Sequence, residues 1–214
     1  MSHIDDLIAK LCPEGVEYKQ LKELCSEFIV PMRDRPKIFD GHIPWCRIED
    51  IEKDSLHGSL SDLKVSERVI SEMNLKVMPT GTVIASCSAS LGRYAITTTP
   101  LITNQTFIGL VCGDQLLNRY LLHLLPLKTE ELASVSNSGT IPYISRAKFE
   151  KLVIPVPPLE IQNEIVKILD KFTELEAELE AELEARKSQY EFYRNELLSF
   201  KHVEEGGGTV DSDG

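Results

Sequence analysis

The order of hydrophobic and polar positions divides the chain into a mixed first part and one long helical run. Residues 4–12 carry apolar side chains at helical spacing, and Pro13 follows, which predicts a short N-terminal helix. Helical spacing returns at residues 65–75 and 115–125. Short strand-like runs, separated by Gly, Pro, Asp and Ser, lie at residues 27–30, 43–51, 82–87, 94–98 and 106–112. These elements predict a sheet or small barrel with helices on one side, and hence an α+β body.

Prolines mark the end of this body at residues 151–158, "KLVIPVPP", because they disfavour helix and hold the chain extended. Beyond them, apolar residues follow at steps of three and four, the pattern of a coiled-coil seam. The predicted seam consists of Ile161, Ile165, Ile168, Phe172, Leu175, Leu179, Leu183, Tyr190, Tyr193 and Leu197. We therefore expect a domain at 1–158, a spacer and dimerisation helix at 159–201, and a disordered tail at 202–214.

The long helix has two further features that bear on pairing. Leu179 and Leu183 follow at successive steps of four, so the helix is expected to bend or straighten there. Six glutamates between Glu174 and Glu184 have no Lys or Arg among them, and they serve either a basic partner surface or a solvated flank. A helix from residue 160 to 200 measures about 60 Å. The predicted partner for its apolar stripe is a second copy, or a homologous helix in another subunit.

Charge is distributed unevenly along the chain, whose net charge is −11. Residues 159–214 hold 15 acidic and 6 basic side chains, whereas residues 1–158 hold 19 and 17. The acidity therefore belongs to the helix and tail, and it does not exclude a nucleic-acid partner for the body. Within the body, residues 33–47 hold four basic side chains against two acidic ones, which favours a local basic patch.

No motif for catalysis or metal binding is found. The chain lacks a phosphate-binding loop, CxxC pairs and metal-ligand histidine spacing, so its five cysteines are expected to be buried free thiols. A methyltransferase loop of the Asn/Asp-Pro-Pro-aromatic type is excluded because Leu159 follows Pro157 and Pro158. Without a signal peptide or a membrane-length apolar run, the chain is expected to be soluble and cytoplasmic.

Polar loops between the predicted strands are the candidate binding elements. Arginine side chains can hydrogen-bond to the edge of guanine, and asparagine or glutamine side chains to the edge of adenine. Surface solubility and ordinary turn structure are the competing explanations for such residues. The candidates for DNA contact are Arg33, Arg35, Lys37, Ser90, Arg93, Asn104 and Gln105.

Four stretches carry a resemblance to a known family, at residues 12–25, 79–107, 138–169 and 190–200. They resemble the specificity subunit of type I restriction-modification enzymes, and "IPVPPLEIQNEIV" is similar to the junction between target-recognition domain and spacer helix in that family. The resemblance implies a non-catalytic subunit whose body reads half of an interrupted double-stranded DNA target and whose helix pairs antiparallel. It also implies methyltransferase subunits that bind S-adenosylmethionine, and an endonuclease and translocase subunit, as partners.

The family usually joins two recognition domains and two spacer helices in one chain, whereas one of each is found in this sequence. The resemblance therefore implies a half-subunit that works as a homodimer on an interrupted palindrome, or with another specificity chain. A coiled-coil interaction scaffold without DNA binding is the alternative function. A fragment of a methyltransferase or nuclease is disfavoured because its loops are missing.

Overall fold

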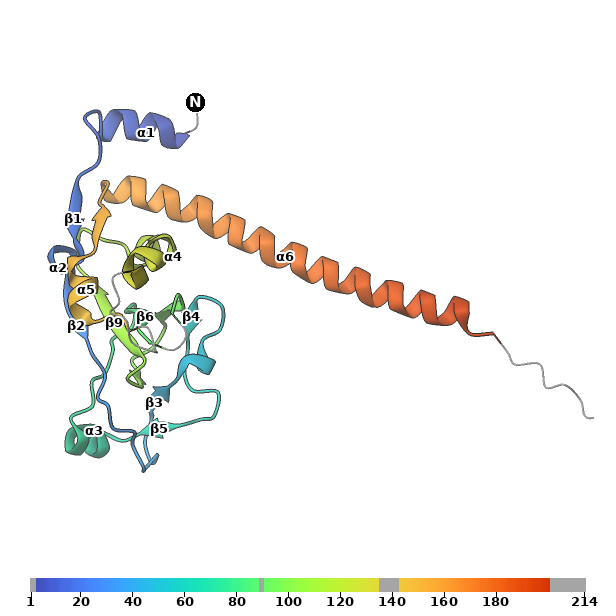
Figure 1. The fold of residues 1–214 in the computed structure, drawn as a ribbon, viewed down its shortest axis with the longest axis horizontal. Helices are drawn as coiled ribbons and strands as arrows, with labels where there is room; N and C mark the ends of the chain where they lie inside the picture. Colours follow the sequence, from blue (N-terminus) through green and yellow to red (C-terminus); the bar gives the residue numbers. More distant parts are fainter. Residues whose placement is uncertain (1–2, 89–90, 135–142, 201–214) are drawn as a thin grey trace, which may run out of the picture. The chain divides into compact units, whose positions relative to one another are not determined.

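The computed structural model describes residues 3–88, 91–134 and 143–200 of the chain, which forms two compact units, Met1–Leu169 and Asp170–Gly214. Helix α6 (Leu159–Leu198) begins in the first unit and continues into the second (Figure 1). The predicted fold class, an α+β body followed by a long C-terminal helix, is confirmed. The helix begins where the prolines predicted, but the first unit includes about three of its turns. The predicted tail at 202–214 lies outside the described residues.

The main sheet of the first unit has five strands, and its middle strands are buried on both faces. Along β6, Val83 and Ala85 pack into one hydrophobic cluster and Ile84 packs into another on the opposite face. This explains why the run reads as continuously apolar in the sequence. All neighbouring strands are antiparallel except β7 and β4, which are parallel. In spatial order the strands are β2 (Cys25–Ile29), β9 (Phe107–Cys112), β6 (Val83–Ser86), β7 (Tyr94–Thr97) and β4 (Ser55–Leu56).

Helix α4 (Asn118–Ser134) packs against β6 and β7 and covers one face of this sheet, as predicted. The helical spacing predicted a helix over residues 115–125, whereas the helix of the structure begins at Asn118 and continues past Pro126 to Ser134. Leu125 and Leu132 are buried on either side of Pro126, so the packing of both halves outweighs the roughly 3 kcal/mol that an internal proline costs. The helix therefore continues through the proline.

A smaller sheet at the other end of the unit has the order β5 (Lys64–Val65), β3 (Ile43–Cys46) and β8 (Ile102–Thr103). Helix α3 (Glu67–Met73) packs on it, because Val69 shares a buried cluster with Trp45 and Ile102. Strand β3 is shorter than the predicted 43–51. The chain leaves the sheet after Cys46 and enters a 3₁₀ turn, η1 (Ile48–Asp50), where the Asp50 carboxylate accepts a hydrogen bond from the Arg47 backbone.

Two distant segments form a third, two-stranded sheet that the sequence did not predict. Strand β1 (Tyr18–Gln20) pairs antiparallel with β10 (Val153–Pro155), so the proline-rich segment is indeed extended. The short helices α2 (Leu21–Leu24) and α5 (Arg146–Lys151) contact each other beside this pair. The N-terminal helix α1 (His3–Leu11) forms as predicted and has no buried residue.

The first turns of α6 belong to the core of the first unit. Ile161 is 1% exposed, and Ile165 packs against the same cluster that lies under α4. Gln162 is fully buried beside them: its Oε1 accepts a hydrogen bond from the Leu117 backbone (2.9 Å), and its Nε2 donates to the carbonyls of Gln115 (2.9 Å) and Pro157 (2.8 Å). Ile161 and Ile165 were predicted as seam residues, but they are used within the chain, so the exposed stripe begins at Ile168.

In the second unit the apolar side chains of α6 are exposed. Helix α6 is continuous from Leu159 to Leu198, so the steps of four do not interrupt it. At about 100° per residue, the seam residues from Ile168 to Leu197 form a single stripe roughly 80° wide. Arg186 and Lys187 pair within the helix with Glu182 and Glu184, both at 3.5 Å. The exposed stripe consists of Ile168, Phe172, Leu175, Leu179, Leu183, Tyr190, Tyr193 and Leu197.

Candidate nucleic-acid interface

A cleft of about 260 Å³ in the first unit brings together four of the seven residues predicted to contact DNA. Arg33 and Arg35 reach it from the loop after β2, and Asn104 and Gln105 reach it from the turn between β8 and β9. The sequence did not select the remaining lining residues, which are Met32, Asp34, Trp45, Arg47 and Thr106. Three guanidinium groups and one carboxylate make the cleft electropositive, which suits an anionic ligand.

Parallel pairing of β3 with β8 creates this convergence. Trp45 lies opposite Ile102 and Cys46 opposite Thr103, so the two strands end at the same edge of the small sheet. Arg47 follows one strand and Asn104 follows the other, and the Asn104 backbone donates a 3.1 Å hydrogen bond to the Cys46 carbonyl. Side chains more than fifty positions apart in sequence therefore lie at one cleft.

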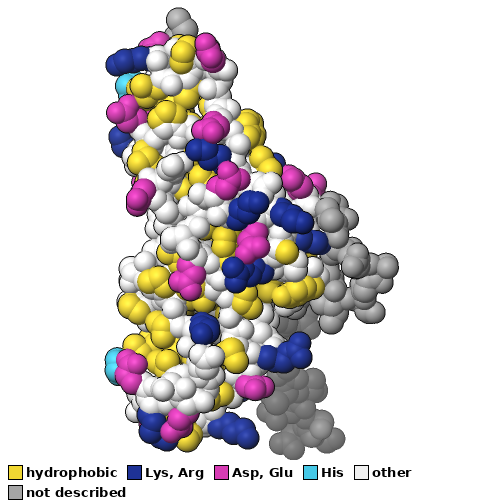
Figure 2. Space-filling model, turned by 90° about the vertical axis from the view of Figure 1, so that its left-hand side faces the viewer, with side chains coloured by type: hydrophobic (Ala, Val, Ile, Leu, Met, Phe, Trp, Pro, Cys, Tyr) yellow, Lys and Arg dark blue, Asp and Glu magenta, His cyan; other side chains and the backbone are white. Residues whose placement is uncertain are grey.

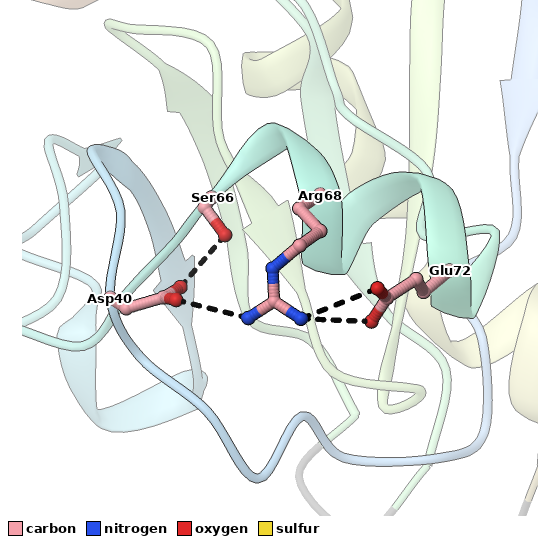
Figure 3. Close-up of polar contacts among 4 residues, drawn as sticks. All are labelled: Asp40, Ser66, Arg68 and Glu72. Atoms are coloured by element: carbon pink, nitrogen blue, oxygen red, sulfur yellow. Dashed lines mark hydrogen bonds and ion pairs between the residues drawn. The ribbon is translucent and has the colours of Figure 1, made fainter.

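The loop that carries Arg33 and Arg35 is fastened at several points. Pro31 and Pro36 are buried, while the two arginines between them are exposed. Further along the loop, Asp40 accepts hydrogen bonds from the Ser66 hydroxyl (2.7 Å) and from Arg68 (3.2 Å) at the start of α3. Arg68 also pairs with Glu72 one turn later (Figure 3). These contacts hold the loop at a defined position on α3 without using the arginines of the cleft.

This network predicts a pH-dependent contribution to stability. The hydrogen bond from Ser66, followed by the interactions with Arg68, lowers the pKa of Asp40 below its usual value. A lowered folded-state pKa stabilises the protein above the unfolded pKa of about 3.9, and the contribution disappears as pH falls through the folded value. We expect Asp40→Asn to lower the urea midpoint at pH 7 and to match the wild type at the acid end. A difference that stays constant as pH falls would contradict this role.

Arg35 is positioned by aromatic stacking. Its guanidinium carbon lies 5.2 Å from the ring centroid of Trp45 and 5.8 Å from that of Phe39. Such cation–π contacts contribute about 0.5–2 kcal/mol and fix the plane of the guanidinium. Trp45 is 4% exposed and belongs to the core around α3, so the stacking surface is itself rigid. Arg35 therefore presents its donors at the cleft from a preorganised position.

Arg47 is positioned from its backbone. Asp50 is 2% exposed and accepts hydrogen bonds from the backbone N–H groups of Arg47 (2.6 Å) and Leu60 (2.8 Å). The Arg47 side chain pairs with Glu49 at 3.3 Å, while its buried Nε has no hydrogen-bond partner within the described ranges. The signal in the sequence was that Arg47 lies two positions after Trp45 within the strand predicted at residues 43–51.

Asn104 supports the turn at the cleft, as the competing explanation from the sequence proposed. Its Oδ1 accepts hydrogen bonds from the Thr106 hydroxyl (2.6 Å) and backbone (3.4 Å). The side chain of Gln105, between them, is exposed. Asn104 therefore shapes the turn that presents Gln105, and Gln105 is the member of the pair with a freely oriented amide.

The other predicted contact residues do not line this cleft. Lys37 borders a neighbouring hollow of about 500 Å³ between the loop and α3. Arg93 lies in the connection from β6 to β7, where its backbone bonds to Ser86. Ser90 lies outside the described residues. A second hollow beside the cleft shares Arg33 and Gln105 with it and adds Val30, Pro31, Ser88 and Tyr143.

Some other basic side chains of the body have partners of opposite charge. Arg119 pairs with Asp54, and Lys128 pairs with Glu131 at 2.8 Å. Figure 2 shows Lys and Arg side chains near the middle of the face that carries α2 and α5, with acidic side chains among them. There Arg146 pairs with Glu150 at 2.6 Å. This face is of mixed charge, whereas the cleft has an excess of arginine.

The described residues, 3–88, 91–134 and 143–200, contain possible metal ligands and five thiols. They contain no group of three or more His, Cys, Asp or Glu side chains placed to hold a metal ion. All five cysteines are free, and burial raises the pKa of Cys46, close to the cleft, to about 12, so this thiol stays neutral. Across the described ranges no helix has the length and apolar character to span a membrane.

The body presents exposed arginine and amide groups on loops that a rigid sheet holds, and a helix with an exposed apolar stripe follows it. These features are typical of a nucleic-acid-binding domain joined to an assembly helix. A comparison with known protein families identifies the family within this class. The family model described as type I restriction modification DNA specificity domain matches residues 13–185. The chain therefore belongs to this family, as the resemblance indicated.

Curated relatives agree with this assignment. The EcoprrI specificity subunit of Escherichia coli is 35% identical over 183 residues, which cover 78% of this chain and 45% of that protein. The MjaIX specificity subunit of Methanocaldococcus jannaschii is 26% identical over 195 residues, which cover 88% of this chain and 45% of that protein. The chain thus spans about half the length of the curated relatives it matches.

Solved structures agree in fold. The HsdS subunit from Thermoanaerobacter tengcongensis superposes with a TM-score of 0.63 at 22% identity, over 83% of this chain and 44% of that one. A chain from a structure of the type I R-M system superposes with a TM-score of 0.64 at 23% identity, over 88% and 48%.

Proposed function

We propose that this chain reads one half of a bipartite DNA target and that two copies, joined through α6, read an interrupted palindrome. The observation that carries the proposal is the convergence of Arg33, Arg35 and Arg47 with Asn104 and Gln105 at one cleft, in a member of the DNA specificity family. The chain contributes recognition. Methyltransferase subunits that bind S-adenosylmethionine and an endonuclease and translocase subunit contribute the chemistry of the assembled enzyme.

Recognition at the cleft uses two kinds of contact. A guanidinium group donates in parallel to guanine O6 and N7, and a glutamine amide pairs with adenine N6 and N7. The side chains best placed for such base contacts are Arg35, whose guanidinium lies over the Trp45 ring, and Gln105, which is exposed at the turn. Arg33 is exposed and lacks a stacking partner within the described residues, so it is assigned to the phosphate backbone.

The charges along α6 favour antiparallel pairing of two copies. Parallel helices would place the glutamates of residues 174–184 beside the same glutamates of the partner, and like charges at close range repel. Pairing centred near Glu184, midway between the exposed residues Ile168 and Phe200, places Arg186 near Glu182 of the partner and Arg194 near Glu174 of the partner. The antiparallel dimer would therefore place basic side chains of the partner beside the glutamate-rich segment.

A symmetric dimer implies a symmetric target. Each identical recognition domain meets the same half-site in the opposite orientation, so the target is an inverted repeat. The 40-residue helix measures about 60 Å, and B-DNA has a turn of about 34–36 Å. The unspecified gap between the half-sites therefore corresponds to between one and two turns of DNA.

Replacing the two loop arginines tests the cleft. We expect Arg33→Ala/Arg35→Ala to weaken binding to the target by roughly 10- to 100-fold, since removing a base-specific hydrogen-bonded pair costs about 1–3 kcal/mol. Each phosphate that the variant no longer neutralises should also reduce the salt slope of binding by about one. Binding is measured by gel shift with the methyltransferase subunit present, over a series of salt concentrations.

The matched control is Arg146→Ala/Lys151→Ala, which removes the same charge from the mixed face on α5. It should retain the affinity and the salt slope. Unchanged affinity and slope in the Arg33/Arg35 variant would remove these residues from the interface. Absence of any DNA binding by the complex would instead favour a coiled-coil scaffold.

A further inference from the structure

Three exposed apolar side chains gather at the hollow beside the cleft. The hollow measures about 390 Å³, and Val30 and Tyr143 line it together with Arg33 and Gln105. Met32 lines the adjoining cleft. Tyr143 is 52% exposed, Val30 is 45% exposed and Met32 is 38% exposed. Single exposed apolar residues are ordinary on a protein surface, whereas several around one hollow with polar groups at its rim are typical of an interaction site.

The backbone holds Tyr143 at this hollow. Ser88 pairs with Tyr143 in an antiparallel bridge, and the Ile144 N–H donates a 2.8 Å hydrogen bond to the Cys87 carbonyl, just beyond the end of β6. Ile144 is buried in the core cluster that lies under α4. Burial raises the pKa of Tyr143, and the charge of Arg33 acts in the opposite direction, which indicates that these two side chains lie close together. Tyr143 is therefore presented from a fixed point beside the arginine.

The turn that carries Gln105 is fastened to the same segment. The Cys87 N–H donates a 2.8 Å hydrogen bond to the Thr106 carbonyl, and the Cys87 thiol donates to the same carbonyl at 3.1 Å. Cys87 therefore connects the segment of Tyr143 with the turn of Gln105. The hollow thus presents an amide that can pair with adenine and an apolar surface side by side.

Thymine carries the apolar group that such a surface can recognise in DNA. Among the base edges of the major groove, the C5-methyl of thymine is the apolar group, and the others are hydrogen-bond donors or acceptors. Adenine, which a glutamine amide suits, is paired with thymine, so an apolar surface beside Gln105 fits an A·T-containing half-site. The charge of Arg33 favours a phosphate-bearing ligand over an uncharged apolar one.

We propose that the hollow beside the cleft recognises a thymine of the target through its C5-methyl group, with Val30 and Tyr143 as the residues that determine this specificity. This inference rests on the proposed DNA recognition and adds one base to those that the cleft contacts. Tyr143 contributes its ring, and its hydroxyl is not needed for the contact. The methyl group leaves water in the complex and is held between apolar side chains.

Replacing thymine by deoxyuridine removes only this methyl group and tests the proposal on the wild-type chain. The target is identified first by sequencing of methylated sites, and each thymine of the target duplex is then replaced in turn. Affinity is measured by fluorescence anisotropy with the methyltransferase subunit present. We expect at least one position at which deoxyuridine weakens binding roughly 3- to 10-fold, since one methyl group is no longer buried. Equal affinity at every position would overturn the proposal and leave DNA recognition standing.

Variants of the hollow then assign the methyl contact to its residues. Val30→Ser/Tyr143→Ser should bind the thymine and deoxyuridine targets with equal affinity, and Val30→Ser alone should reduce the preference for thymine. Tyr143→Phe keeps the ring and should keep the preference. The matched control Tyr18→Ser/Val153→Ser removes the same two types of exposed side chain from β1 and β10, away from the hollow, and should also keep it.

The outcomes separate this contact from the proposed function. The preference is a ratio of two affinities measured on one protein, so a loss of stability that lowers both affinities equally does not change it. Variants at Val30 and Tyr143 that prefer thymine as strongly as the wild type would show that the methyl group is recognised elsewhere and would overturn the proposal. A wild-type complex that binds no DNA would overturn the DNA recognition on which the proposal rests.

Discussion

Leu179→Asp/Leu183→Asp is expected to dissociate the proposed dimer and to reduce affinity for the proposed bipartite target by more than about 100-fold. Leu179 is 66% exposed and Leu183 is 55% exposed, so the packing of the first unit is unaffected. In the pair, the new carboxylates face an apolar stripe already flanked by glutamates. Binding of one dimer to two half-sites raises the overall affinity about 10²- to 10⁴-fold over binding to a single half-site. A monomer lacks this increase in affinity.

The matched control is Ala181→Asp/Ala185→Asp, which adds the same two charges on the side of α6 away from the stripe. Sedimentation should show a dimer for the control and a monomer for the leucine variant at the same concentration. Fluorescence anisotropy should show intact affinity for the control only. Tight binding by a leucine variant that sediments as a monomer would mean that recognition does not depend on pairing.

Gln162→Ala is expected to destabilise the first unit by about 3 kcal/mol. The substitution leaves the Leu117 N–H and the carbonyls of Gln115 and Pro157 without their hydrogen bonds in a buried site, and each unmet buried group costs about 1–3 kcal/mol. For a chain of this size, the melting temperature should fall by roughly 6–12 °C.

Asn163→Ala is the control for that substitution. Asn163 is the next residue of the same helix, is exposed, and donates only to the Leu159 carbonyl one turn earlier. Its effect should stay within about 0.5 kcal/mol, the usual range for surface positions. Equal unfolding free energies of the two variants in urea would show that Gln162 does not anchor the helix.

The sequence predicted the elements whose signal is local. The central strands β6, β7 and β9 were recognisable because residues 83–86, 94–97 and 107–112 form short apolar runs between turn residues. The start of α6 was recognisable from the prolines before Leu159. The pairing of β1 with β10 was not, because it joins residues about 135 positions apart, and nothing within residues 18–20 or 153–155 indicates the partner.

The same distinction applies to the cleft. Arg33 and Arg35 were selected from their loop, and Asn104 and Gln105 from theirs, but their convergence depends on the parallel pairing of β3 with β8. Arg47 was missed because its importance comes from that pairing. Along α6, Ile161 and Ile165 continue the seam pattern of the exposed residues, so periodicity alone does not show that they pack into the body.

Methylome sequencing of cells that express this chain with its methyltransferase subunit tests the central claim most directly. One measurement reports the modified sequence, its symmetry and its gap. Two identical recognition units joined by antiparallel helices predict methylation at an inverted repeat whose halves are separated by unspecified bases. Methylation at a continuous site without an inverted repeat would contradict the account.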